Sequence, residues 1–94
     1  MLAMELIPAI RARLDELEHG GALAGGQRAA LWRAQQYAAH FNHTVDDLRL
    51  YCLQALKPRQ FLDEEDEGDY LRGFRQGFQT VLQEIRQVET RTRG

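Results

Sequence analysis

A heptad repeat of apolar residues near the C-terminus restricts this chain to helical folds. Large apolar residues recur there at intervals of three, four, three, four and three positions. This spacing places them on one side of an α-helix and favours packing against another helix. We therefore predict a long helix over residues 63–90 with this seam as its main contact surface. The seam consists of Leu71, Phe74, Phe78, Val81, Ile85 and Val88.

Gly73 and Gly77 lie one turn apart at the edge of the seam. Each glycine costs roughly 1 kcal/mol in a helix interior relative to alanine, so a glycine pair here indicates close approach by another group. One interpretation is packing on a helix of the same chain. The alternative is a homodimer in which the seam pairs with its own copy. Asp63 is the expected N-cap, and the acidic residues after it suit the positive end of the helix dipole.

Hydrophobic periodicity predicts three shorter helices, over residues 7–19, 27–41 and 45–56. Two glycines favour a left-handed end to the first helix, and GGALAGG, residues 20–26, is expected to be a flexible joint. The second helix carries small residues that allow a neighbouring helix to approach closely. Its expected apolar stripe consists of Ala30, Leu31, Ala34, Tyr37, Ala38 and Phe41.

The predicted fold is all-α, a single domain built as a compact four-helix bundle with a long C-terminal helix. A chain of 94 residues makes one core but buries a modest fraction of its surface, so a partner or a second copy can matter for stability. The content of 44% hydrophobic and 28% charged residues is typical of a globular chain. A net charge of −2 argues against a strongly electrostatic binder of nucleic acid or membranes.

Catalytic, metal and cofactor sites are not expected. His40 and His43 are three residues apart, but no further side chain completes a metal site with suitable spacing. Cys52 falls on the apolar side of helix 45–56, where burial raises the pKa of a thiol and makes it unreactive. A single cysteine requires no oxidising compartment, and no segment has the pattern of a signal or membrane span. The expected protein is a non-enzyme of the cytoplasm.

Trp32 is the leading candidate for a binding residue. It falls opposite the apolar stripe of helix 27–41, beside Arg28 and Gln36. An exposed tryptophan among polar groups is typical of binding hot spots. The interpretation that we favour from the sequence is nevertheless that this helix is buried on two sides and Trp32 packs on the first or the last helix.

Two further groups are candidates for contact with a protein partner. Leu50 and Leu53 point away from the apolar face of helix 45–56, so this helix is either central or offers a second apolar surface. The acidic segment DEEDEGD is solvated and is a candidate for partner binding, including mimicry of nucleic acid. Its candidate residues are Glu64, Glu65 and Asp66.

The segment from Ala38 to Tyr51 resembles a helix-turn-helix. This resemblance implies a DNA-binding transcriptional regulator whose second helix enters the major groove. Asp46 and Asp47 open that helix, and DNA phosphates would repel their carboxylates, which makes nucleic acid the less favoured partner. The matching small, turn, cap and apolar positions are Ala38, Asn42, Thr44, Val45, Leu48 and Tyr51.

The function predicted first is that of a small protein-binding regulator or inhibitor that occludes a larger protein partner or complex. Chains of this size and style are typical of bacterial and phage-borne accessory proteins, including inhibitors of host machinery. The alternative is the helix-turn-helix regulator, expected to act as a dimer. A membrane partner is not expected.

Overall fold

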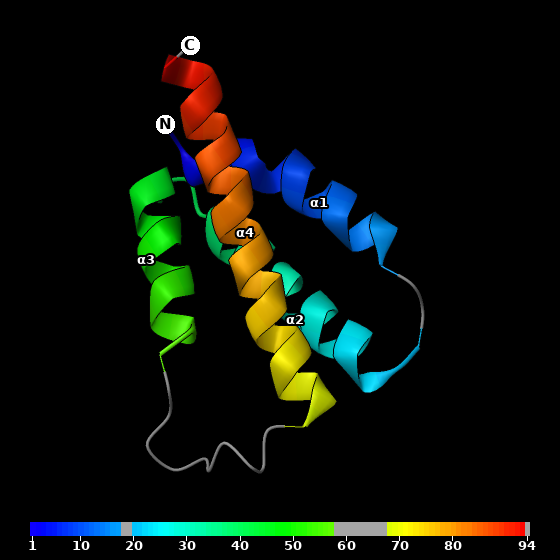
Figure 1. The fold of residues 1–94 in the computed structure, drawn as a ribbon. Coiled ribbons are helices and arrows are strands. Elements are labelled where there is room, and N and C mark those ends of the chain that lie inside the picture. Colours follow the sequence, from blue (N-terminus) through cyan, green and yellow to red (C-terminus); the bar gives the residue numbers. More distant parts are fainter. Residues whose placement is uncertain (18–19, 58–67, 94) are drawn as a thin grey trace.

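The computed structural model describes residues 1–17, 20–57 and 68–93. In these ranges the chain forms an all-α bundle with a long C-terminal helix, as predicted. Figure 1 shows α4 running across α2, with α3 at one edge of the bundle and α1 on the other side. In chain order the elements are the 3-10 helix η1 (Ala3–Leu6), α1 (Ile7–Glu16), α2 (Ala22–Ala38), α3 (Val45–Ala55) and α4 (Asp69–Arg93).

The largest helix–helix contact joins α2 to α4, and small residues make it. A Cβ atom added at Gly26 would lie 2.0 Å from the carbonyl oxygen of Tyr70, and one added at Gly73 would lie 2.0 Å from a backbone oxygen of α2. At Gly77 the added atom would lie 2.6 Å from the Cβ of Ala30. Gly73 and Gly77 therefore pack on a helix of the same chain, as the first of the two interpretations expected.

The segment GGALAGG differs from its predicted structure. Gly20 and Gly21 have φ angles of 107° and 85°, so the expected left-handed turn is present. However, α2 already begins at Ala22, and the prediction of a flexible joint over residues 20–26 is wrong beyond residue 21. The close approach of α4 requires Gly26 in the helix, and this tertiary contact outweighs the low helix propensity of glycine.

The predicted helix ends also need correction. α1 ends at Glu16 instead of residue 19, and α2 ends at Ala38. Phe41 consequently lies beyond α2 and is 73% exposed, so its assignment to the buried stripe is wrong. α4 begins at Asp69. The expected N-cap, Asp63, lies outside the described residues.

Aromatic stacking fixes the turn between α2 and α3. The ring of Tyr37 stacks on His43 at 3.9 Å and on Tyr51 at 4.4 Å between centroids. Nδ1 of His43 also lies 2.8 Å from the carbonyl oxygen of Tyr37, an oxygen that a longer α2 would use for its own backbone hydrogen bonding. The same oxygen accepts a hydrogen bond from the backbone N–H of His40 at 3.3 Å, so both contacts cap the C-terminal end of α2.

The first residues of the chain belong to the fold. The backbone N–H of Ala3 donates to the carbonyl oxygen of His43 at 2.9 Å, and that of Val45 donates to Met1 at 3.0 Å. These bonds frame an antiparallel bridge at Leu2, and Ala3 is fully buried. The N-terminal residues thereby hold the start of α3 in place.

Candidate functional site

Trp32 lies on the outer side of α2 and is 52% exposed. Ala30 and Ala34, on the opposite side of the same helix, are fully buried. α2 is therefore two-sided, and the favoured interpretation, in which Trp32 packs on another helix, is wrong. Arg28, which is partly buried, and the exposed Gln36 stand one turn before and after Trp32. We refer to Trp32, Arg28 and Gln36 as the Trp32 face.

Leu50 and Leu53 are also exposed, at 57% and 46%. They point outward from α3, whose other side buries Val45, Leu48 and Cys52. Figure 1 shows α3 at the edge of the bundle, so the interpretation that places this helix at the centre is wrong. Leu50 and Leu53 lie on α3, whereas Trp32 lies on α2.

The helix pair that resembles a helix-turn-helix has an acidic start on α3. The hydroxyl of Thr44 accepts a hydrogen bond from the backbone of Asp47 at 3.2 Å, and the Asp47 carboxylate accepts one from the backbone of Thr44 at 2.9 Å. The bond from the Thr44 backbone favours the charged carboxylate and lowers the pKa of Asp47. A negative charge therefore stands where a DNA-reading helix would meet phosphate.

The middle of α3 is equally unlike a DNA-reading surface. Its exposed side chains include Leu50 and Leu53, which offer no hydrogen bond to a base edge, beside the polar Gln54. The guanidinium of Arg49 forms ion pairs with Asp46 and with Glu89 of α4, and the bond to Glu89 raises its pKa. Its charge is thus largely balanced within the chain.

The heptad seam of α4 is used inside the bundle. Phe78, Val81 and Ile85 are almost fully buried, while Leu71 and Phe74 are partly buried. The two glycines at its edge contact α2. A homodimer through this seam would require α4 to separate from α2.

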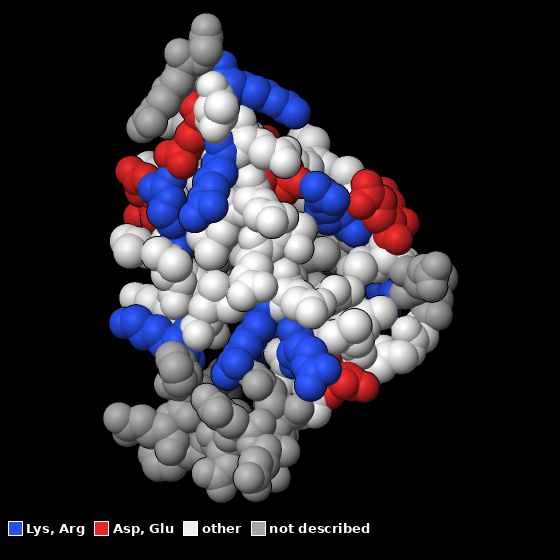
Figure 2. All heavy atoms as spheres, in the orientation of Figure 1, with Lys and Arg blue, Asp and Glu red and all other residues white. Residues whose placement is uncertain are grey.

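Opposite the seam, α4 presents an exposed polar face. Arg72 and Arg86 lie toward its two ends, and Gln79 and Gln83 lie between them, all exposed. Figure 2 shows this side of the molecule, with cationic side chains above and below an uncharged centre.

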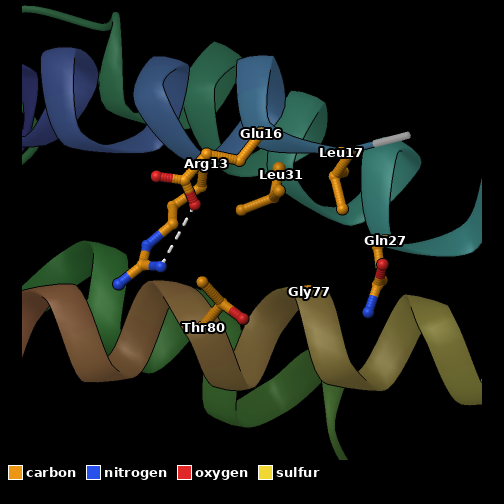
Figure 3. Close-up of a pocket in the computed structure, with 7 residues that line it drawn as sticks. All are labelled: Arg13, Glu16, Leu17, Gln27, Leu31, Gly77 and Thr80. Atoms are coloured by element: carbon orange, nitrogen blue, oxygen red, sulfur yellow. Dashed lines mark hydrogen bonds and ion pairs between the residues drawn. The ribbon is translucent and has the colours of Figure 1, made fainter. Parts of the chain in front are cut away.

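A small hollow lies between α1, α2 and α4 (Figure 3). Its volume of about 210 Å³ is below the 300–1,000 Å³ typical of sites for small molecules. Arg13 reaches from α1 toward α4 at its rim, but this side chain is paired with carboxylates. We assign no ligand to the hollow. It is lined by Arg13, Glu16, Leu17, Gln27, Leu31, Gly77 and Thr80.

An ion pair at the seam edge was missed from the sequence. Nε of Arg13 donates to Glu84 at 2.7 Å, and Glu84 is only 8% exposed. This hydrogen bond to the carboxylate of Glu84 stabilises the charged guanidinium and raises the pKa of Arg13. Glu84 follows Val81 by three residues and Gly77 by seven. A carboxylate at that helical position was the available signal for a polar contact beneath α1.

The candidates for reactivity or metal binding are Cys52 and the side chains that could act as metal ligands. Cys52 is buried, and burial raises the pKa of its thiol to about 12. Over residues 1–17, 20–57 and 68–93, no three potential metal-binding side chains come together. In the same ranges no helix is long and apolar enough to cross a membrane. Glu64, Glu65 and Asp66 lie outside the described residues.

Comparison of the chain with protein-family models, curated proteins and solved structures finds no match. A functional proposal therefore has to come from the fold and its surfaces. Those surfaces define a small helical protein with exposed apolar groups on α2 and α3.

Proposed function

We propose that this chain is a non-enzymatic, cytoplasmic regulator or inhibitor that holds or occludes a larger protein partner through the Trp32 face. The observation that supports the proposal is the indole of Trp32, which is 52% exposed in the middle of an otherwise regular helix. Trp32 points away from α4, so its large apolar side chain is not needed for the packing of α2 on α4.

The chemistry of the Trp32 face suits a protein partner. An indole offers a large apolar surface together with one N–H donor, and tryptophan is enriched among residues that dominate binding energy. Arg28 and Gln36 flank it and can supply hydrogen bonds at the rim of an interface. A partner with an apolar pocket bordered by carbonyl or carboxylate groups would match this face.

The test begins with capture of partners by the tagged chain from its source cell, with nuclease treatment and a moderate-salt wash. With the partner identified, Trp32→Ala should weaken binding by about 2 kcal/mol or more, roughly 30-fold. Phe41→Ala is the matched control, because Phe41 is an exposed aromatic residue beyond the end of α2. It should leave affinity unchanged.

Each outcome of this experiment is decisive. A stoichiometric complex that survives both treatments and is lost with Trp32→Ala supports the proposal. Unchanged binding by a folded Trp32→Ala variant contradicts the assignment of the face. If nuclease removes every partner, the helix-turn-helix alternative takes first place.

The exposed polar face of α4 is an observation that favours a nucleic-acid partner. Binding through Arg72 and Arg86 would weaken steeply with added salt, because phosphate contacts release counterions. Arg72→Glu should then abolish it. Affinity that is indifferent to salt would rule this function out.

A further inference from the structure

One side of α3 faces away from the rest of the bundle and carries four exposed side chains. Asp46, Leu50, Leu53 and Lys57 are separated by four, three and four residues, which places them along one side of a helix. Lys57 lies just beyond α3, but its backbone N–H still donates to Gln54 at 3.2 Å and continues the last turn. We refer to these four residues as the outer face of α3.

The spacing of the residues on the outer face of α3 is the same from either end of the helix, and only the charges at the two ends differ. Its two ends are an acid, Asp46, and a base, Lys57, and two leucines stand between them. If a second copy of α3 lies antiparallel on this face, Leu50 meets Leu53 of the second copy. In the same register Asp46 meets Lys57 of the second copy. A two-fold axis generates each of these contacts twice, as an isologous interface requires.

We propose that a second copy of this chain docks on the outer face of α3, as an antiparallel helix pair. Four exposed leucines leave water at its centre, which drives the association. Two ion pairs close its ends and select the register, because a parallel pair would set Asp46 against Asp46 and Lys57 against Lys57. Asp46 also pairs with Arg49 of its own helix, whose guanidinium is held by Glu89 of α4, so in the dimer its carboxylate is shared between Arg49 and Lys57 of the second copy.

The arrangement of the monomer permits this contact. α3 stands at the edge of the bundle, so its outer side is not covered by α2 or α4 (Figure 1). The contact spans Asp46 to Lys57, about 17 Å of helix at 1.5 Å per residue. An interface of that length is small, and the dimer is therefore weak and reversible.

This dimer goes beyond the proposed function and does not depend on it. Trp32 lies on α2 and takes no part in the outer face of α3. A dimer would present two Trp32 faces to a partner. Trp32→Ala should therefore leave the monomer–dimer equilibrium unchanged, which separates a failure of one proposal from a failure of the other.

Sedimentation equilibrium of the full chain over a range of concentrations tests the proposal. We expect a reversible dimer with a dissociation constant between about 10 μM and 1 mM. Leu50→Asp should weaken dimerisation by about tenfold or more, because it places carboxylates at the apolar centre. Circular dichroism should show an unchanged helix content, since Leu50 is exposed in the monomer. A chain that is monomeric at about 1 mM would overturn the proposal.

A charge exchange tests the antiparallel register. Asp46→Lys and Lys57→Asp should each weaken the dimer by about fivefold or more, because each sets like charges opposite one another. The double variant should recover the original dissociation constant to within about twofold, since the pairs are restored with opposite sign. Asp15→Lys, an exposed acid on α1, is the control and should have no effect. Failure of the double variant to recover would overturn the register.

Discussion

The two sides of α2 meet their surroundings in opposite ways. On the inner side, Gly26 and Ala30 let α4 come into direct contact, and a Cβ added at Gly26 would collide with its backbone. On the outer side, Trp32 projects into solvent with half of its surface accessible. The small residue Gly26 at the α4 contact is thus one that the fold cannot enlarge, whereas the large Trp32 is one that it can exchange. Residue size alone would have suggested the reverse.

Adjacent glycines give the sharpest test of this contrast. Gly26→Ala should destabilise the protein by about 3 kcal/mol or more, because its Cβ would lie 2.0 Å from the carbonyl oxygen of Tyr70. Gly25→Ala should instead stabilise it by up to about 1 kcal/mol, since its Cβ would make an ordinary 3.9 Å contact with the Tyr70 ring and alanine favours the helix. Urea unfolding measures both. Effects of equal sign would contradict the backbone contact between α2 and α4.

A smaller loss is expected on the other flank of the inner contact, where α1 meets α4. Glu84→Gln removes the charge that pairs with Arg13 at 2.7 Å. Breaking a buried pair costs several kcal/mol, but the Arg13 side chain is 38% exposed and water can solvate it. We expect a loss of about 1–2 kcal/mol in unfolding free energy. Glu16→Gln, at the exposed partner of Arg13, is the control and should change stability by less than about 0.5 kcal/mol.

The cap of α3 should contribute still less and should depend on pH. Thr44→Ala removes the hydroxyl that accepts from Asp47 and should cost about 1 kcal/mol. Because folding lowers the pKa of Asp47 below 3.8, its carboxylate stabilises the fold fully above that pH. The contribution disappears as the pH falls through the lower folded pKa. Asp47→Asn should therefore flatten this part of the stability profile, and an unchanged profile would show that the carboxylate does not cap α3.

Trp32→Ala should have the smallest effect on stability. The indole is exposed, so its removal should change the unfolding free energy by no more than about 0.5 kcal/mol. The same denaturant titration measures it. A loss of 3 kcal/mol or more, as for a core tryptophan, would remove the difference between the two sides of α2.

Periodicity predicted most of the bundle because each helix has one dominant buried side. The seam of α4 and the alanines of α2 could be predicted from the sequence as buried, because their spacing follows the helical turn. The helical conformation of Gly26 could not be predicted, since two adjacent glycines that follow a Gly-Gly turn locally favour a loop. Only the approach of α4, remote in sequence, keeps this segment helical.

The surface was harder to predict than the core. Helical position placed Trp32 and Leu50 outside, but it could not say whether another helix covered them. That depended on where α3 sits in the bundle. Lys57 was overlooked for a related reason, because it follows the end of α3 and joins the outer face only through the hydrogen bond that continues the last turn.

The backbone contact between α2 and α4 also supplies a means of recognising relatives. A chain with this fold can change most of its apolar residues, because a core tolerates exchange at constant volume. It cannot enlarge Gly26, Gly73 or Gly77 without moving a helix. Distant relatives should therefore share three small residues at these positions, followed by the α4 heptad, even where the rest of the sequence has diverged. A search built on that pattern would reach further than overall sequence similarity.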